Sequence, residues 1–142
     1  GTYEPLSEFI NSAQKQGFNP EYTSVSFVPS FDLFDEVNSP SNIMVTEIVP
    51  NPLNCNDNFC TEFLADMQAS NIKKPSRLHF EGYINAMAFS KAAKNCQFPL
   101  QQSCLMNELN SLLVTDTLIQ KLFINTENNN KRNVYRSYYV NK

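Results

Sequence analysis

The chain has 142 residues, of which 42% are hydrophobic, and its formal net charge is −3. A domain of about 150 residues buries roughly 70% of the surface that its unfolded chain exposes, so this length supports one domain with a real core. The 11 Lys and Arg residues are scattered along the sequence, so no basic stripe is available for phosphates and we expect no nucleic-acid partner.

The first half of the chain alternates between helical and strand patterns. Apolar residues recur at helical spacing over residues 3–16, with Pro5 in the first turn and Gly17 placed to end the helix. β-Branched and aromatic residues then predict a short strand over 23–28. The apolar run 43–49 predicts a buried strand that ends at prolines.

Three helices and two strands are expected further along the chain. The helices cover 57–70, 77–94 and a leucine-rich segment that Ser103 would cap. Residues 119–125 and 133–142 then predict two strands joined by a polar hairpin loop. This order of elements indicates an α/β fold with a C-terminal antiparallel strand pair.

The start of the sequence bears on the compartment. It has no signal-like segment, and no apolar run in the chain is long enough to cross a bilayer. The protein is therefore either cytosolic or one from which a targeting segment has been removed. A first residue other than Met, in the opening Gly-Thr-Tyr, favours removal.

Four cysteines form two closely spaced pairs, Cys55 with Cys60 and Cys96 with Cys104. Bridges within the pairs would each stabilise the fold by roughly 2 to 3 kcal/mol, because they close loops in the unfolded chain, but they require an oxidising compartment. Buried free thiols are the alternative. The spacings lack the Cys-x2-Cys step of common zinc sites, and the single histidine, His79, lies apart, so we expect no metal site.

Catalytic motifs are missing from the sequence. It has no Gly-rich phosphate loop, no Gly-x-Ser-x-Gly elbow and no His-Glu-x-x-His motif, so we expect neither an enzyme nor a cofactor. Glu62 and Asp66 are interpreted as part of a solvated helix face, and His79 as a capping or partly buried residue. Tyr3 lies at a helix N-terminus, where backbone N–H groups and the helix dipole favour anions. Two interpretations of Tyr3 are therefore open, a ligand contact or a simple packing role.

Four segments carry a resemblance to a known family: "GTYEPLSEFINSAQKQGFN", "SVSFVP", "NIMVTEIVPNP" and "RLHFEGYINAMAFSKAAK". In this order and spacing, over essentially all 142 residues, the chain resembles type I periplasmic solute-binding proteins. Within them it is similar to the branched-chain amino acid (Leu/Ile/Val) receptor family of extracellular ligand-binding domains.

The resemblance implies one half of a bilobed α/β receptor, which closes around a small solute between two Rossmann-like lobes. The family's N-terminal half has no counterpart here, so the chain is expected to be the C-terminal half only, a fragment of a larger protein. Residues 1–74 are expected to belong to the second lobe, and residues 75–142 to form a return segment toward the first lobe. The paired cysteines then fit a periplasmic or extracellular protein.

The resemblance also implies a site and partners. Carried over from the family, the ligand contacts are Tyr3 in the Gly-x-Tyr turn and Ser26 and Phe27 near the end of the next strand. Amino acid receptors often have an acidic residue at that strand end, for the ammonium group of the ligand, where this chain has Ser26. The expected ligand is an amino acid or a related small carboxylate, and the receptor would serve an ABC importer or a membrane sensor.

Gly82 interrupts the helix predicted over 77–94, at a cost of about 1 kcal/mol relative to alanine. The absence of a side chain at Gly82 would be useful if another part of the protein packed closely against the helix there, or if a ligand came close to it. The resemblance favours packing, in which Gly82, Ala86 and Ala93 let the helix lie close against a sheet that this chain largely lacks.

A structural or interaction module that reuses the same half-fold is the alternative function. Such a module would have no ligand of its own. A second copy of the chain would then cover the apolar surface left by the absent half. Light scattering distinguishes the two hypotheses in part, because a monodisperse monomer would exclude a dimer that replaces the missing lobe.

Overall fold

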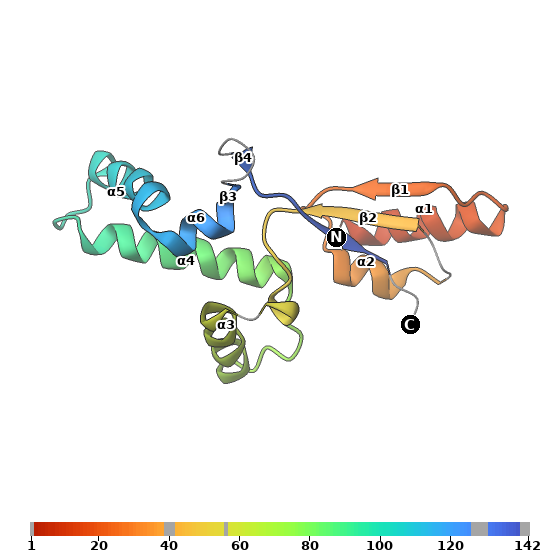
Figure 1. Cartoon of the computed structure of the whole chain (residues 1–142). Helices are drawn as coiled ribbons and strands as arrows, with labels where there is room; N and C mark the ends of the chain where they lie inside the picture. Colours follow the sequence, from red (N-terminus) through yellow and green to blue (C-terminus); the bar gives the residue numbers. More distant parts are fainter. Residues whose placement is uncertain (1, 39–41, 56, 126–130, 140–142) are drawn as a thin grey trace. The chain divides into compact units, whose positions relative to one another are not determined.

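The chain is described here by a computed structural model (Figure 1). It describes residues 2–38, 42–55, 57–125 and 131–139.

The protein divides into two compact units. The first unit combines Gly1–Ile48 with Val134–Lys142, and the second unit is the continuous segment Val49–Asn133. The change of lobe predicted near residue 74 therefore does not coincide with the division between the units, because the chain leaves the first unit after Ile48. The assignment of the two units to lobes of a receptor stays a prediction.

A three-stranded mixed sheet forms the centre of the first unit, with strand order β1-β2-β5. β1 and β2 are parallel, with Ser24 opposite Val45, whereas β5 is antiparallel to β2. A sheet with a parallel pair and helices confirms the α/β class. The strands are β1 (Glu21–Ser24), β2 (Asn42–Glu47) and β5 (Tyr135–Tyr138).

Two helices cover one face of this sheet, α1 (Tyr3–Lys15) and α2 (Ser30–Glu36). Both pack on the same face because Ile43 and Val45, which point to one side of β2, share a core with residues of both helices. Gly17 ends α1 as predicted, with a positive φ of 77°. The core residues of the first unit are Ile10, Val28, Leu33, Val37, Ile43 and Val45.

The predicted strand over 23–28 is displaced in the structure. β1 begins at Glu21 and ends at Ser24, and the chain then turns, with Val28 N–H donating to the carbonyl oxygen of Val25 at 3.0 Å. The turn buries Val28 in the core while Phe27 stays exposed. Ser26 and Phe27 therefore lie in a turn after the strand rather than in the strand itself.

The second unit is a layer of helices with an aromatic core. The ring centroid of Phe80 lies 5.6 Å from that of Phe59 and 4.8 Å from that of Phe63. Its elements are η1 (Pro52–Asn54), α3 (Asn58–Ala69), α4 (Arg77–Lys94), α5 (Gln102–Thr115) and α6 (Thr117–Phe123), with the short strands β3 (Ile124–Asn125) and β4 (Lys131–Arg132).

The start of α4 confirms a capping role for His79. The Ser76 side chain accepts a hydrogen bond from the His79 N–H, and His79 Nδ1 accepts one from the Ser76 N–H at 3.1 Å. This reciprocal pair forms a capping box, which satisfies two backbone donors that a helix start would otherwise leave unpaired. Helix α4 covers the predicted residues 77–94.

Gly82 lies on the exposed side of α4. A Cβ atom built at this position would have no described atom within 4 Å beyond its immediate surroundings in the helix. The buried residues Phe80 and Ile84 occupy the opposite side of the helix. The partner surface expected for Gly82 is thus not among the described residues, and its packing role stays a prediction.

The predicted strand over 119–125 is wrong for most of its length, because residues 117–123 form α6. The Asp116 side chain accepts hydrogen bonds from the N–H groups of Leu118 and Ile119, at 3.0 and 3.1 Å, and so starts a helix there. Ile119 and Leu122, three residues apart, are both buried. The expected cap at Ser103 is also displaced, since α5 already begins at Gln102.

The predicted C-terminal strand pair is present only in a shorter and displaced form. β3 and β4 are antiparallel but pair over only two residues on each strand, and the longer β5, from the predicted second strand, pairs with β2 in the first unit. Residues 126–130, which belong to the predicted hairpin loop, lie outside the described residues.

Candidate functional site

The three residues predicted as ligand contacts lie near the carboxyl end of β1, in the first unit. Helix α1 precedes β1 and runs back along the sheet, so the start of α1 meets the turn after β1 (Figure 1). The Thr2 hydroxyl donates to the carbonyl oxygen of Phe27 at 3.1 Å and joins the two segments. The structure therefore brings the turn before Tyr3 and the turn containing Ser26 and Phe27 together, at the sheet edge where α/β proteins bind ligands.

The exposure of these three residues differs. Phe27 is 67% exposed, although it is a large apolar side chain. Tyr3 and Ser26 are half-buried, and Tyr3 packs against the core of the first unit. Tyr3 therefore packs against the core, as one of the two roles considered from the sequence requires. Part of its side chain is also accessible at the sheet edge.

Acidic side chains surround this edge. The pKa of Tyr3 is raised above its usual value, first by the negative charge of Glu4, then by desolvation and by the charges of Asp32 and Glu36. The Tyr3 phenol is protonated at neutral pH, as an ordinary tyrosine already is, and can act as a hydrogen-bond donor. The same charges favour a cationic group near the turn.

A second candidate is a surface hollow of about 770 Å³ within the second unit. Three helices contribute to its walls, and α4 does so through residues at spacings of four, Tyr83, Met87 and Lys91. Its other lining residues are Asp57, Asn58, Phe59 and Glu62 from the start of α3, and Thr117, Leu118 and Lys121 from α6.

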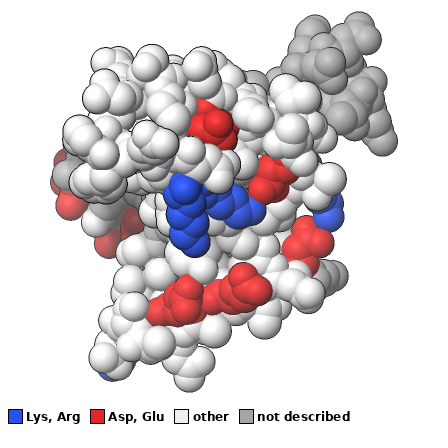
Figure 2. Space-filling model, turned by 90° about the vertical axis from the view of Figure 1, so that its left-hand side faces the viewer, with Lys and Arg blue, Asp and Glu red and all other residues white. Residues whose placement is uncertain are grey.

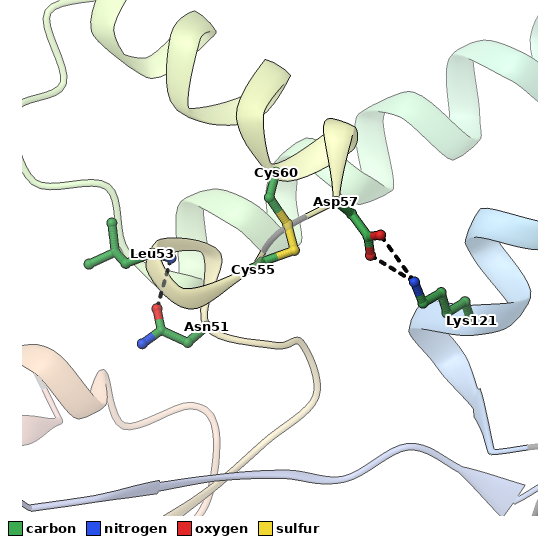
Figure 3. The surroundings of a disulfide bond; sticks show 6 residues. All are labelled: Asn51, Leu53, Cys55, Asp57, Cys60 and Lys121. Atoms are coloured by element: carbon green, nitrogen blue, oxygen red, sulfur yellow. Dashed lines mark hydrogen bonds and ion pairs between the residues drawn. A yellow bond between two sulfur atoms is a disulfide. The ribbon is translucent and has the colours of Figure 1, made fainter.

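The two lysines of the hollow are held in ion pairs. Lys121 Nζ lies 2.9 Å from Asp57 Oδ2, and Figure 3 shows this contact between α6 and the start of α3. Lys91 Nζ lies 2.6 Å from Asp116 Oδ2. Hydrogen bonding to Lys91 is the largest cause that holds the pKa of Asp116 below its usual value, against an opposing effect of burial.

Figure 2 shows the face of the molecule that carries the helices of the second unit. Basic side chains lie near the middle of this face, with acidic side chains on several sides of them. The mixture of charges gives the face no single-sign patch of the kind that steers a highly charged partner.

Tyr83 connects the hollow to the aromatic core. Its hydroxyl donates to Asp66 Oδ2 at 2.7 Å, and its ring lies 5.5 Å from Phe59 and 5.3 Å from Phe63, measured between centroids. The hydrogen bond to Asp66 is the main cause that raises the pKa of Tyr83 to about 12. Asp66 is therefore more than a solvated residue of α3, because it fixes the phenol of α4.

Both disulfide bonds considered from the sequence are present, and all four cysteines are bonded. Cys55 is joined to Cys60, with Cα atoms 5.9 Å apart, and Cys96 to Cys104, at 6.0 Å. The first bond closes the short loop that contains Asp57, beside the contact with Lys121 (Figure 3). The second bond links the segments after α4 and at the start of α5.

The sequence analysis named Tyr3, Ser26 and Phe27 at the β1 edge as ligand contacts, which stays a prediction, and it named no lining residue of the hollow as a ligand contact. The signals for the hollow were present: Tyr83, Met87 and Lys91 share one face of a helix, and Asp116 precedes an apolar run as a cap would. Among the described residues, no group of three His, Cys, Asp or Glu side chains could hold a metal ion. In the same part of the chain, no helix is both long and apolar enough to span a bilayer.

Comparison with known proteins gives one relevant likeness. No protein-family model matches the chain, and neither does any curated protein. The chain is similar to the crystal structure of a possible leucine/isoleucine/valine-binding protein from Rhodopirellula baltica SH 1, with a TM-score of 0.77 and 26% sequence identity. The match covers 96% of this chain and 38% of that protein. This likeness supports the periplasmic-binding-protein-like fold that the sequence motifs suggested.

Proposed function

We propose that the chain is the C-terminal part of an exported receptor that binds a small solute reversibly and catalyses no reaction. The observation that carries the proposal is the structural likeness over 96% of the chain to a possible leucine/isoleucine/valine-binding protein. Because the chain spans 38% of that protein, the complete binding site requires polypeptide beyond these 142 residues. An ABC importer or a membrane sensor is the proposed partner of the complete receptor.

The proposed ligand is an amino acid or a related small carboxylate, bound at the carboxyl end of β1. The start of α1 offers backbone N–H groups and the positive end of the helix dipole to a carboxylate, next to the Tyr3 phenol. Phe27, which is 67% exposed, offers an apolar surface to the ligand side chain. Ser26 contributes a hydroxyl at the same turn.

An ammonium group on the ligand needs a negative partner that Ser26 does not provide. The negative charges of Glu4, which is the largest cause, and of Asp32 and Glu36 raise the pKa of Tyr3, and Asp32 lies in the first turn of α2. We therefore assign the ammonium end of an amino acid ligand to the side of the site that faces Asp32. With this assignment, an amino acid ligand is compatible with Ser26 at the strand end, where amino acid receptors often have an acidic residue.

Export agrees with the cysteine chemistry. Disulfides persist in oxidising compartments and are rare in the cytosol of most organisms. Both cysteine pairs of this chain are bonded. A periplasmic or extracellular location follows as part of the proposal, and a thiol count on the protein isolated from its natural source would test it.

The proposal is tested by ligand-induced stabilisation of the complete parent protein. A ligand that binds only the folded state raises its unfolding temperature, by an amount equivalent to about 2.7 kcal/mol at a concentration of 100 times Kd. We expect a shift with leucine, isoleucine or valine, or with a small carboxylate. No shift with any of them would contradict the receptor function, and the 142-residue chain alone should bind weakly because it supplies one wall of the cleft.

A matched pair of phenylalanines locates the site. Phe27→Ala should weaken binding in the complete protein by about tenfold or more, since it removes a buried apolar contact from the complex. Phe18→Ala is the control, because Phe18 is 59% exposed in the same unit but lies beyond the other end of α1. Equal affinity in the two variants would move the site away from the β1 turn.

A further inference from the structure

We propose that the hollow of the second unit is a binding site for a small organic cation, a primary amine with an apolar body. The residues that line the hollow all belong to the second unit, Val49–Asn133, whereas the proposed solute site lies in the first unit. The inference therefore concerns a separate site, and it does not depend on the receptor function.

The hollow has the size and the apolar surface of a small-molecule site. Its volume of about 770 Å³ lies within the range of roughly 300 to 1,000 Å³ that such sites have. The rings of Phe59 and Tyr83 lie 5.5 Å apart, between centroids, on its wall. Tyr83, Met87 and Leu118 also line the hollow and are half-buried against the aromatic core. Together these side chains offer a preformed apolar surface to the body of a ligand.

The two lysines of the hollow already have anionic partners. Lys121 is paired with Asp57, and Lys91 with Asp116, which is itself fixed by two N–H groups at the start of α6. The disulfide bond at Cys55 closes the loop that carries Asp57, so this side of the hollow is fixed before a ligand arrives (Figure 3). An anionic ligand would have to displace a carboxylate from one of these pairs.

Glu62 of α3 and Tyr83 of α4 supply hydrogen-bond acceptors to the hollow. The Tyr83 hydroxyl donates its own proton to Asp66 Oδ2 at 2.7 Å, so its oxygen is left to accept from a ligand. The Glu62 carboxylate forms no hydrogen bond or ion pair with the other described residues. A primary ammonium group has three N–H donors and no acceptor, and so it matches both groups.

The balance of charge also favours a cation. Four carboxylates and two ammonium groups line the hollow or contact its lining residues, which leaves an excess of two negative charges. A cation is attracted to these carboxylates and to the face of an aromatic ring, whereas a neutral or anionic ligand is not. The carboxylates belong to Asp57, Glu62, Asp66 and Asp116, and the ammonium groups to Lys91 and Lys121.

Phenethylamine and hydrocinnamate form a matched pair of probes. They share a phenyl ring on a two-carbon chain, which ends in an ammonium group in the first compound and in a carboxylate in the second. In calorimetric titrations of the 142-residue chain, the amine should bind about tenfold more tightly than the acid, or better. Equal affinity, or tighter binding of the acid, would overturn the proposal.

Glu62→Gln removes the charge and keeps the shape of the side chain. It should weaken phenethylamine binding by about tenfold, because a hydrogen bond to a charged group is lost. Glu81→Gln is the matched control, since Glu81 belongs to α4 but does not line the hollow, and it should leave the affinity unchanged. Wild-type affinity in the Glu62→Gln variant would overturn the proposal.

A second pair of variants locates the ligand by volume. Thr117→Trp places a large side chain at the wall of the hollow and should weaken phenethylamine binding by about tenfold or more. Thr61→Trp is the control, because Thr61 is exposed on α3, as Thr117 is on α6, but does not line the hollow. Equal amine affinity in the two variants would place the ligand elsewhere and overturn the proposal.

The complete parent protein separates this site from the proposed solute site. Phenethylamine should bind there too, and saturating leucine should not displace it. Binding to the 142-residue chain but not to the parent would overturn the proposal, because further polypeptide would then occupy the hollow. Phenethylamine binding in a parent that binds no amino acid or small carboxylate would contradict the proposed function and support the second site.

Discussion

The two units of this protein are stabilised by different means. The first unit joins two distant segments of the chain, and the buried hydrogen bond from the Ser137 hydroxyl to Glu47 Oε1, at 3.2 Å, connects residues 90 positions apart. The second unit is one continuous segment with an aromatic core and both disulfides. Local contacts form faster than distant ones, so the second unit should fold first and the first unit should close around its returning strand.

The largest effect is expected from cavities in the two cores. Phe63→Ala should destabilise the second unit by about 3 to 5 kcal/mol, and Leu33→Ala the first unit by about 2 to 5 kcal/mol, because both side chains are fully buried. Hydrogen exchange read by mass spectrometry shows which amides lose protection in each variant. Loss of protection throughout the chain in both variants would mean that the two units unfold together. That result would contradict the view that each unit is stabilised by its own core.

Removal of the disulfides should affect the second unit alone. Replacement of both cysteines of a pair with serine should cost about 2 to 3 kcal/mol, since each bond restricts a short loop of the unfolded chain. The pair Cys55 and Cys60 should cost more than the pair Cys96 and Cys104, because Cys60 is buried in the aromatic core. Urea unfolding followed separately for each unit checks this, and an equal loss in the first unit would contradict it.

Alkaline pH provides a smaller test, at Tyr83. Its pKa in the folded state is raised to about 12, above the ordinary value of 10.0, so the folded state keeps the phenol proton more tightly than the unfolded state does. The resulting stability is complete below about pH 10 and is lost between about pH 10 and 12. Tyr83→Phe should cost about 1 kcal/mol at neutral pH and abolish this loss. In the Tyr83→Phe variant, phenolate absorbance should show one fewer tyrosine that titrates at high pH.

Acidic pH provides the smallest test, at Asp116. Its pKa is lowered in the folded state, so its contribution to stability is present above the unfolded pKa and is lost as the pH falls through the folded value. Asp116→Asn keeps an oxygen to cap α6 but removes the charge beside Lys91. It should cost about 0.5 kcal/mol at pH 7 and progressively less as the pH falls through the folded-state pKa of Asp116. A cost that does not change with pH would assign the effect to the cap.

Elements with strong local signals were predictable. α4 covers its predicted residues 77–94. β2 begins at Asn42, one residue before the predicted run 43–49, and ends at Glu47. The helix period and the apolar run belong to neighbouring residues, so no distant contact was needed to recognise them. The Gly17 ending of α1 has the same explanation.

Elements whose structure depends on a distant partner were not predictable. Residues 119–123 have an apolar content that suits a strand, but the Asp116 cap and the burial of Ile119 and Leu122 against the second unit make them a helix. Likewise, β5 pairs with β2 rather than with the segment just before it, a choice that local residues do not encode. The hollow was missed for the same reason, because it combines three helices.

The sequence was sufficient to predict the α/β class, most helices and the resemblance to solute-binding proteins, because these features rest on residue types, short spacings and their order. It indicated which cysteines could pair, but the choice between disulfides and free thiols came from the structure. Tertiary structure alone decided the division into two units, the position of the turn that holds Ser26 and Phe27, and the exposure of Gly82. Each of these depends on which distant surfaces meet and which stay bare, and such contacts have no signature at short range in the chain.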